Sequence, residues 1–564
     1  MLGKIVVSLV SLLLVVGVIL GVILVIGESA HDEKEHQQDA SASMKYVAAI
    51  CEPTTYKDAC ARSIEPAAKN SSATAKDYID AVVQATLVEM KKSLEVTEKT
   101  VVNKDSDNYN YLALEDCKQL LDKAIDTLQE SLQVVDANMD TIEDKAHQLL
   151  SWMTATHSLQ MICIDQIEKP ELKSSLDNGL VNSTQLAHNA VHIFAQLSQI
   201  LKLFNVQQNV KPSSRRLLQA AINKRDGFPT WFGAAERRLL ARGGQQARPN
   251  AVVAKDGSGQ FKTIGQAVAA YPKNHQGRYT IYVKAGVYDE QVIIEKKQPN
   301  IYIYGDGIGR TIVTGRKNYG KMKITTMNTA TFATEGNGFI ARAMTFRNEA
   351  GPEGHQAVAF RSQASQTAVF DCSFEGFQDT LYYQVNSQFY RSCWIFGTVD
   401  FIFGMGDAVI QESTIVVRKP MAKQVNTVTA DGRTIGGEKA SNGLVLQNCI
   451  IAPDKFLFNE RFKFPTYLGR PWKKDALTVV MQSELGDFIR PEGYMIWQGE
   501  SNHKTCEMYE FGNRGPGART DGRSKDFSRF RVLKPQEAAR YTPGPFLGGQ
   551  TWIPGTGIPH KLGL

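Results

Sequence analysis

The stretch Phe377–Gly404, FQDTLYYQVNSQFYRSCWIFGTVDFIFG, contains two aspartates whose spacing indicates a repeat. Asp379 and Asp400 are 21 residues apart, and Cys372 and Cys393 share that offset. Two residue types at one offset indicate one structural repeat that contains both. If each repeat is one coil in a stack of strands, the two carboxylates lie on neighbouring strands, about 4.7–4.9 Å apart.

Short runs rich in β-branched and aromatic residues follow one another through residues 251–564, with Gly, Asn and Asp between them. Corresponding positions are separated by 28, 21, 20 and 36 residues; they are Met344, Cys372, Cys393, Ser413 and Cys449. Irregular repeats of this size without helices between them predict an all-β parallel β-helix. A β-sandwich would require antiparallel hairpins, and Asn-Gly or Asp-Gly turns are few here.

Residues 45–205 are predicted to be helical, because apolar side chains recur there every three or four positions. One such stripe is formed by Cys117, Leu121, Ala124, Leu128, Leu132 and Val135. Stripes of this kind are typical of the core of a helical bundle. The chain is therefore predicted to be multidomain, with an all-α bundle before the β-helix.

Four of the eight cysteines lie in the helical part. Cys51 and Cys60 are close enough in sequence to join an N-terminal helical hairpin, and Cys117 and Cys163 to join two helices. No CxxC pair occurs, which argues against a zinc site. Sequons begin at Asn70 and Asn182, and we expect N-glycosylation there if the chain is secreted.

Net charge differs sharply along the chain. Residues 1–210 carry 17 Lys and Arg against 28 Asp and Glu, whereas residues 251–564 carry 38 against 28. The acidic first part and the basic last part are expected to attract each other, and a basic domain suits a polyanionic partner. Nucleic acid is not the expected partner, because basic residues cluster densely only in 211–250 and no nucleic-acid motif is present.

The first 27 residues include an apolar run, 5–26, long enough to span a bilayer as a helix. Lys4 precedes the run and acidic residues follow it, so the remainder is expected on the lumenal side. A signal anchor is favoured over a cleaved signal peptide, whose core is normally shorter. Either alternative sends the chain into the secretory pathway, with membrane contact through this span before processing.

Residues 206–250 lose the helical periodicity and gain Pro, Gly and Arg. The sequence Arg-Arg-Leu-Leu occurs in this linker at 215–218 and again at 237–240. Dibasic sites in an exposed linker are good protease targets. Cleavage is therefore predicted after one of the two arginine pairs, Arg215 and Arg216 or Arg237 and Arg238.

Two stacked carboxylates cannot both ionise easily, so one pKa rises and the other stays low. Such a pair supplies one nucleophile or base and one acid, as in glycosidases and in ester hydrolases that use an aspartate nucleophile. Gln378 precedes Asp379 and Gln356 lies 22 residues upstream, so two amides are available for a tetrahedral oxyanion. These neighbours favour ester hydrolysis.

Further on, YLGRPW supplies Arg470, a candidate partner for the ionised aspartate, and Trp472, a flat face for a sugar ring. No GxSxG motif is present, which disfavours an ordinary serine esterase.

The segments GHQAVAF, FQDTLY, GTVDFIFG and YLGRPW, in this order, resemble those of plant pectin methylesterases, as does GVYDEQV at 286–292. The resemblance covers roughly 250–564 and implies a right-handed parallel β-helix that hydrolyses the methyl ester of galacturonosyl units in pectin, releasing methanol. It also implies roles for the matching residues. Asp400 is then the nucleophile, Asp379 the acid and base, Gln356 and Gln378 the oxyanion hole, Arg470 the residue that orients Asp400, and Trp472 a sugar contact. No metal or organic cofactor is implied.

Residues 45–205 resemble the pectin methylesterase inhibitor and invertase inhibitor family through the segments CEPTTY and LEDC and the spacing of four cysteines. This resemblance implies a four-helix bundle with Cys51–Cys60 and Cys117–Cys163 disulfides. It further implies a pro-region that inhibits the enzyme, related inhibitor proteins as partners, and cleavage of the RRLL motifs by a subtilase-type protease. The destination is then the cell wall.

Two residues depart from the catalytic family's usual pattern. Asp431 stands where glutamine is frequent, and Tyr494 where tryptophan is frequent. The cysteines of the β part match no clear pairing: Cys372 and Cys393 are candidates for a disulfide, or all four are free. Two alternative functions are a polygalacturonase or pectate lyase, and a non-enzymatic pectin-binding wall protein.

Overall fold

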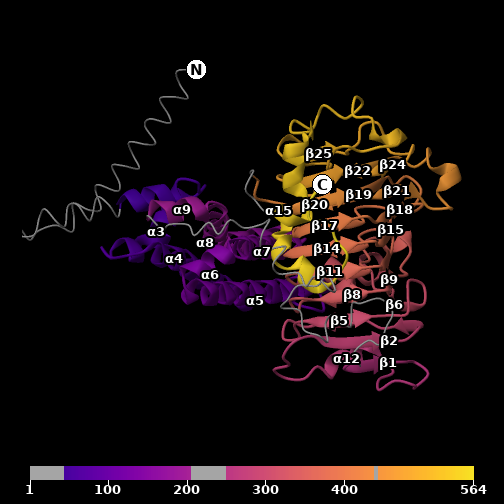
Figure 1. Ribbon diagram of the computed structural model, residues 1–564, viewed down its shortest axis with the longest axis horizontal. Helices are drawn as coiled ribbons and strands as arrows, with labels where there is room; N and C mark the ends of the chain where they lie inside the picture. The colour runs from indigo at the N-terminus through magenta and orange to yellow at the C-terminus, as the bar shows by residue number, and fades with distance from the viewer. Residues whose placement is uncertain (1–43, 205–248, 437–441) are drawn as a thin grey trace, which may run out of the picture.

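The computed structural model describes residues 44–204, 249–436 and 442–564. Figure 1 shows a helical domain lying beside a tall stack of strands. The apolar run at 5–26 and both RRLL motifs lie outside the described residues. Within the described ranges, none of the helices is both long and apolar enough to cross a bilayer.

The helical domain is a four-helix bundle in which α4 and α7 each pack against both α5 and α8. The helices are α3 (Lys57–Ala68), α4 (Ala75–Lys99), α5 (Asn108–Ala137), α6 (Met139–Asp144), α7 (Ala146–Asp165), α8 (Pro170–Ala195) and α9 (Leu197–Leu203). The apolar stripe predicted from Cys117 to Val135 is buried on α5. This confirms the expected bundle.

Both disulfides expected in the bundle are present. Cys51 and Cys60 connect the helical residues 44–51 with α3, and Cys117 and Cys163 connect α5 with α7. A covalent link between α5 and α7 fixes the two helices that also contact the β domain.

The β domain is a right-handed parallel β-helix of three sheets, and every pairing between its named strands is parallel. The 11-stranded sheet contains β1 (Ala251–Val253), β2 (Tyr279–Val283), β5 (Ile301–Tyr304), β8 (Ile340–Arg342), β11 (Thr367–Phe370), β14 (Ser387–Arg391), β17 (Asp407–Gln411), β20 (Gly443–Gln447), β23 (Leu477–Met481), β25 (Glu507–Phe511) and β26 (Arg531–Val532).

The 8-stranded sheet contains β3 (Gly286–Asp289), β6 (Thr311–Gly315), β9 (Thr345–Asn348), β12 (Ser373–Glu375), β15 (Trp394–Gly397), β18 (Thr414–Val417), β21 (Ile450–Pro453) and β24 (Glu484–Leu485). The 7-stranded sheet contains β4 (Val292–Ile294), β7 (Phe332–Thr334), β10 (Phe360–Ser362), β13 (Leu381–Tyr383), β16 (Ile402–Gly404), β19 (Asn426–Asp431) and β22 (Thr466–Gly469). Each coil visits the three sheets in this order.

The sequence repeat corresponds to this coil. Each of the five matching positions, Met344 to Cys449, comes one residue before a strand of the 8-stranded sheet, and those strands pair in register. The repeat length varies because the loops between strands differ in length, while the strands keep their register. The expected β-helix is confirmed.

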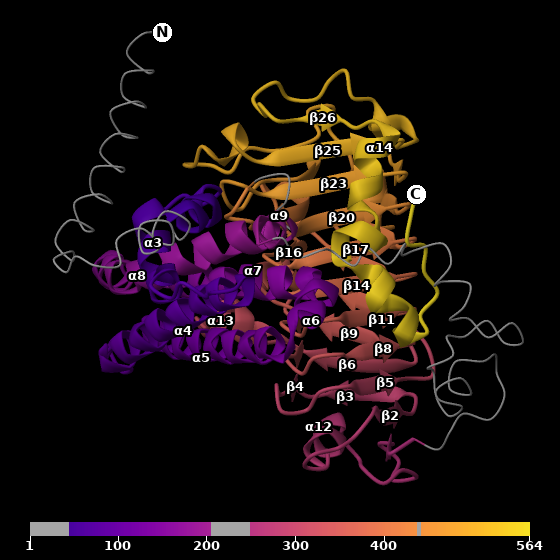
Figure 2. The ribbon, with the colours of Figure 1, turned by 60° about the vertical axis from the view of Figure 1, so that its left-hand side comes forward.

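Alternation along the 7-stranded sheet separates the core from an outer face. Leu381 and Ile402 point into the core, whereas the neighbouring Tyr382 and Phe403 belong to a cluster shared with the bundle. Successive side chains of a strand point to opposite faces, so the outer face of this sheet is the one that the bundle covers. Figure 2 shows α5 and α7 lying across the strands there.

The C-terminal segment covers the 11-stranded sheet with three short helices, α14 (Pro535–Ala538), α15 (Pro543–Leu547) and α16 (Ile553–Thr556). Figure 2 shows this segment, in yellow, running across successive strands of the sheet. Side-chain amides of Gln411 and Gln447 donate hydrogen bonds to the carbonyls of Lys561 and Gly563. The C-terminal segment therefore lies away from the corner between the 8-stranded and 7-stranded sheets.

Candidate active site

Asp379 and Asp400 lie at the same corner, where the 8-stranded sheet gives way to the 7-stranded sheet. Leu381 pairs with Ile402, so the two aspartates occupy equivalent positions on neighbouring coils. Both have a left-handed backbone, with φ of 61° and 50°. This conformation is strained for residues other than glycine and is often found at functional sites. The stacking predicted from the 21-residue offset is confirmed.

Asp400 is held by two residues from later coils. Arg470 donates from Nε to Oδ1 at 2.8 Å and from Nη2 to Oδ2 at 2.5 Å. Thr427 Oγ1 donates to Oδ1 at 2.7 Å and accepts from the Asp400 amide at 2.9 Å. A guanidinium that binds both carboxylate oxygens fixes the orientation of the group.

Asp379 has the opposite environment. Burial raises the pKa of its carboxyl well above the ordinary value, and the charge of Asp400 raises it further, while Arg470 acts in the opposite direction. Both aspartates are buried, with 7% and 5% of their surfaces exposed. The site therefore places a carboxyl whose pKa is raised beside one that is held by a guanidinium, which is the arrangement needed for an acid and a nucleophile.

Gln356 and Gln378 lie on adjacent coils, and Gln378 directly precedes Asp379 in the chain. The amide of Ala357 donates to the carbonyl of Gln378, so the two glutamines are brought together by the backbone. Each is partly exposed. Two carboxamides at the rim of a buried carboxylate pair are available as hydrogen-bond donors to a negatively charged oxygen.

Aromatic side chains surround Arg470. The guanidinium lies 4.2 Å from the ring centre of Trp497, and Trp472 packs edge-on against Phe403. Such a cation–π contact further restricts the arginine. Trp472 and Trp497 also pack against the cluster that the β-helix shares with the bundle.

Thr427 and Trp497 were not predicted from sequence. Thr427 lies one coil beyond Asp400 in the same column, because Ile402 pairs with Thr429. The intervening loop lengthens that coil to 27 residues, so the 21-residue offset does not reveal it. Trp497 reaches Arg470 from a loop after the last strand of the 7-stranded sheet, and no spacing links the two.

Helix α7 of the bundle lies over this region. His157 Nδ1 lies 3.2 Å from Thr434 Oγ1, and Ser158 Oγ donates to the carbonyl of Met405 at 3.3 Å. Ser151 donates to the buried carboxylate of Asp407 at 2.9 Å. The bundle therefore closes over the outer face of the sheet that carries the aspartates.

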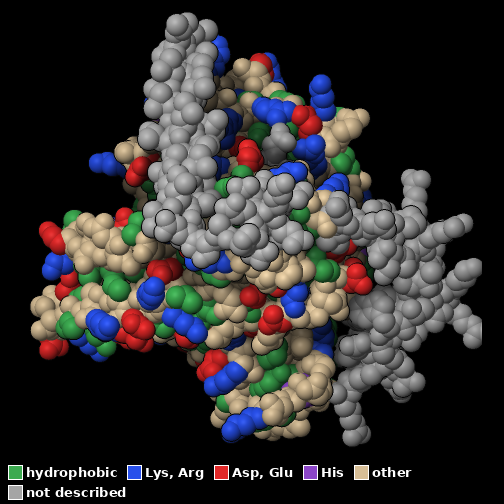
Figure 3. Space-filling model, turned by 90° about the vertical axis from the view of Figure 1, so that its left-hand side faces the viewer, with side chains coloured by type: hydrophobic (Ala, Val, Ile, Leu, Met, Phe, Trp, Pro, Cys, Tyr) green, Lys and Arg blue, Asp and Glu red, His purple; other side chains and the backbone are tan. Residues whose placement is uncertain are grey.

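Ion pairs between the two domains follow the charge difference in the sequence. Lys296 contacts Asp126 at 2.6 Å and Glu130 at 3.5 Å, and Lys473 contacts Asp165. In each of these pairs the bundle supplies the acid and the β-helix the base. By contrast, the outward-facing side of the bundle shows mixed acidic and basic side chains (Figure 3).

Asp431 and Tyr494 are both buried in the β-helix, with 0% and 2% exposed. Asp431 accepts hydrogen bonds from the hydroxyl of Tyr383 and from the amides of Arg433 and Leu477. These departures from the family pattern are accommodated inside the fold, away from the molecular surface.

The four cysteines of the β-helix are free and buried. The sequence left open either a Cys372–Cys393 disulfide or four free cysteines, and the structure has four free cysteines. Equivalent positions on parallel strands point their side chains the same way, and the thiols of Cys372 and Cys393 each donate to a backbone carbonyl two residues earlier. Such parallel side chains do not point toward each other as a disulfide requires.

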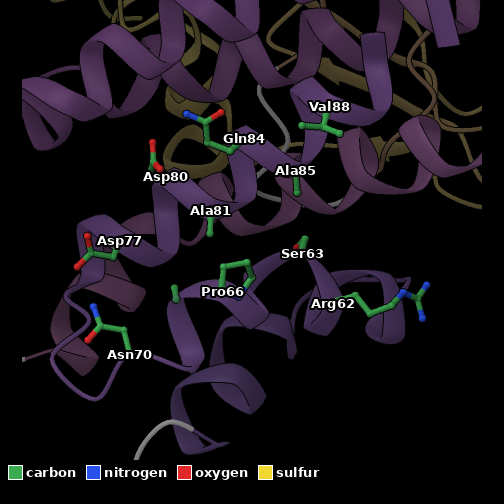
Figure 4. A pocket seen from close by; sticks show the side chains of 11 residues that line it. Arg62, Ser63, Pro66, Asn70, Asp77, Asp80, Ala81, Gln84, Ala85 and Val88 are labelled. Carbon is green, nitrogen blue, oxygen red and sulfur yellow. The ribbon is translucent and has the colours of Figure 1, made fainter. Parts of the chain in front are cut away.

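A separate groove of about 540 Å³ lies on the bundle between α3 and α4. Figure 4 shows Arg62, Asn70, Asp77 and Asp80 around it. These residues lie outside the carboxylate pair and its neighbours. Asn70 Oδ1 accepts hydrogen bonds from the amide and the hydroxyl of Ser72. Asn70 and Ser72 belong to the same sequon.

Comparison with known proteins identifies both domains. Residues 250–550 match the Pectinesterase family, and residues 45–193 match the family described as plant invertase/pectin methylesterase inhibitor.

Among curated relatives, Pectinesterase 4 of Arabidopsis thaliana is 40% identical, with 100% of each chain covered. The putative pectinesterase/pectinesterase inhibitor 45 of the same plant is 40% identical over 92% of this chain and 84% of its own. The solved structure of a pectin methylesterase from carrot is 44% identical and has a TM-score of 0.55. It covers 57% of this chain and 100% of its own. The chain belongs to the pectinesterase family and carries an inhibitor-like domain before its catalytic β-helix.

Proposed function

We propose that this protein hydrolyses the methyl esters of pectin through Asp400 as the nucleophile. The observation that carries the proposal is the pairing of a carboxylate fixed by Arg470 with a neighbouring carboxyl whose pKa is raised by burial. A fixed, ionised carboxylate attacks, and a protonated one donates its proton to the leaving group.

The reaction proceeds in two halves. A carboxylate oxygen of Asp400 attacks the ester carbon, and the amides of Gln356 and Gln378 stabilise the oxyanion that forms. Asp379 then gives its proton to the methoxy oxygen, so that methanol leaves and an anhydride links the sugar to Asp400. Asp379, now ionised, removes a proton from water, which attacks the sugar carbonyl carbon and releases the galacturonate and Asp400.

Substrate binding requires the face that the bundle covers. Trp472 is proposed to contact a sugar ring, and Arg470 to orient the nucleophile as well as border the bound chain. The interdomain contacts of α7 support a bundle that inhibits the enzyme while attached. Cleavage after Arg215 and Arg216, or after Arg237 and Arg238, by a subtilase-type protease would then release the active β-helix.

The same reasoning supports an extracellular destination. Two disulfides in the bundle favour an oxidising compartment, and the plant relatives favour the cell wall. The apolar run at 5–26 is proposed to act as a signal anchor or signal peptide. The exposed sequon asparagines, Asn70 and Asn182, are proposed to carry N-linked glycans.

The test is methanol release from highly methylated pectin by the chain cut in residues 206–250. Asp400→Asn is expected to lower the rate by about a thousandfold or more, because the amide is a poor nucleophile. Asn keeps the shape and one acceptor oxygen, and thermal unfolding of the variant, measured in parallel, separates a loss of fold from a loss of the nucleophile. Equal methanol release by both proteins would refute the nucleophile assignment, and chain shortening without methanol would favour a depolymerase.

A further inference from the structure

Three phenylalanines are exposed on one loop of the β-helix. The loop, residues 454–465, joins β21 to β22 and is called the aromatic loop here. Phe456, Phe458 and Phe462 expose 68%, 54% and 68% of their surfaces. Single exposed apolar residues need no explanation, but several large ones on one short loop mark a binding surface.

The aromatic loop is held in a fixed shape. The carboxylate of Asp454 accepts hydrogen bonds from the amides of Phe456 and Leu457, and the side chain of Leu457 is fully buried in the core. Arg461 is anchored to Asp487 by two hydrogen bonds of 2.9 and 2.8 Å. The rings are thus displayed by a built support, which lowers the entropy lost when a ligand binds.

Each exposed ring is accompanied by a cation. The Arg461 guanidinium lies 4.6 Å from the ring centre of Phe458 and 4.3 Å from that of Phe462. Lys455 Nζ lies 4.9 Å from the ring centre of Phe456. Flat apolar faces combined with positive charges suit a ligand that has both ring faces and negative charges.

Local charge strengthens this preference. Residues 418–425 and 454–465 form consecutive corner loops between the 8-stranded and 7-stranded sheets. Together they carry six Lys and Arg against two Asp and Glu. A net positive surface of this kind attracts a polyanion and makes its binding dependent on salt.

The aromatic loop occupies the same corner as the catalytic pair. Asp400 precedes β16, and β22, which follows the aromatic loop, lies two strands further along the same sheet. At 4.7–4.9 Å per strand, the two coils are on the order of 10 Å apart. Within the described residues, the contacts recorded between bundle and β-helix fall on other segments, including Met405, Thr434 and Lys473.

We propose that the aromatic loop is an accessory binding site for a de-esterified run of galacturonan. The proposal rests on the proposed function, since it extends the same polymer beyond the catalytic pair. Sugar ring faces stack on Phe456 and Phe462, and free carboxylates meet Lys455 and Lys463. A methyl-esterified run offers the same rings without the charges and binds less tightly, so the loop retains product beside the active site.

The experiment measures binding of fully de-esterified polygalacturonate to the uncut chain by calorimetry at low and at high salt. The double variant Phe456→Ser, Phe462→Ser is expected to bind about tenfold more weakly, as the loss of two stacking contacts predicts. Lys463→Gln is expected to weaken binding by a smaller factor and to reduce its salt dependence. Unchanged thermal unfolding of both variants is expected, because the substituted side chains are exposed.

Matched controls come from elsewhere on the chain. Trp394→Ser removes an aromatic side chain that is 44% exposed on the 8-stranded sheet, and Lys297→Gln removes a lysine that is exposed and paired like Lys463. Both controls should bind polygalacturonate like the unsubstituted protein. An equal loss in the controls would overturn the proposal.

Other outcomes would also overturn it: no binding by the unsubstituted chain, no loss in the double variant, or equal binding of neutral dextran. The proposal would also be overturned if the double variant bound polygalacturonate normally but had lost self-association, or had lost binding to vesicles of phosphatidylserine. Because polygalacturonate has no ester and the measurement needs no turnover, this test is separate from the proposed function. Absent methanol release would count against the esterase, whereas absent polygalacturonate binding would count against the loop.

Discussion

Arg470 and Asp400 form the contact on which the chemistry depends most directly. The arginine contributes two donors to one carboxylate, and Thr427 contributes a third. Asp379, one coil away, has no such pairing, and burial raises its pKa. Two identical side chains thus have different surroundings, because only one of them is hydrogen-bonded to the guanidinium.

At the residue scale, Arg470→Gln is expected to lower kcat and to move the alkaline limb of the pH–rate profile upward. The guanidinium charge lowers the pKa of Asp379, so its loss lets this acid keep its proton to a higher pH. The measurement is initial methanol release by the cut chain across pH. Lys423→Gln, on the neighbouring corner loop, is the control and should leave the limb in place. A lower rate with an unmoved limb would show that Arg470 does not act on ionisation.

At the scale of elements, α7 is buried on nearly all sides because it serves two domains. One face completes the bundle, and the other lies on the 7-stranded sheet. Some polar groups at this contact titrate. Burial raises the pKa of Asp407 to about 7 and that of Asp116 to about 6, although both accept hydrogen bonds across the interface.

These carboxyls make closure dependent on pH. A raised pKa means that the closed state gains stability at low pH and loses it as pH rises toward 7. His157 acts in the opposite direction, since burial lowers its pKa to about 3 and protonation below about 6.5 opposes closure. Lys123, with a pKa lowered to about 8, stays charged in both states below that pH and adds little change.

Asp407→Asn is therefore expected to weaken the pH dependence of bundle release. In the unsubstituted protein cut in residues 206–250, the bundle should dissociate about tenfold faster at pH 7 than at pH 5.5. Asn preserves the shape and an acceptor for Ser151 but cannot ionise, so the ratio should fall. Release is measured by gel filtration at both values of pH. Asp289→Asn, on an exposed strand, is the control; an unchanged ratio in Asp407→Asn would refute the assignment.

The Cys117–Cys163 disulfide is a second element-scale feature, because it connects the two helices that contact the β-helix. Closing a loop of 46 residues stabilises a folded domain by about 4 kcal/mol through the unfolded state. The double variant Cys117→Ser, Cys163→Ser should unfold its bundle at a lower temperature in calorimetry and inhibit less. The control Cys449→Ser alters a free thiol of the β-helix and should leave the bundle transition unchanged.

At the scale of the whole molecule, an acidic bundle lies on a basic β-helix and covers the sheet that carries the aspartates. The acids of the bundle pair with lysines of the β-helix, and apolar side chains from both domains form one cluster. Surface ion pairs contribute little individually, so the shared apolar cluster is the main source of the attachment.

The uncut chain is accordingly expected to release methanol more slowly than the cut chain after the bundle has been separated. The expected difference is at least about tenfold, since substrate reaches the aspartates only when the bundle leaves. Initial rates on highly methylated pectin give the comparison, with Asp400→Asn in both forms as the blank. Equal rates for the two forms would show that the attached bundle does not restrict the site.

The sequence by itself determined the coil and much of the site. A shared 21-residue offset placed Asp379 above Asp400, since strands paired in register turn sequence spacing into distance. Helical periodicity identified the bundle, and motif order pointed to Gln356, Gln378 and Arg470. The coil, the bundle and the contact of Arg470 with Asp400 are confirmed, because each depends on local patterns or on one repeat length, whereas the roles of Gln356 and Gln378 stay predictions.

Only the tertiary structure decided what irregular loops and domain contacts bring together. Thr427 joined Asp400 across a coil of 27 residues, and Trp497 reached Arg470 from a later loop. It also decided that the four β-helix cysteines stay free and that α7 covers the catalytic sheet. The physical reason is that loops of variable length prevent the strand register from being deduced from sequence spacing. Side-chain direction, and the docking of the bundle on the β-helix, depend on the packed backbone.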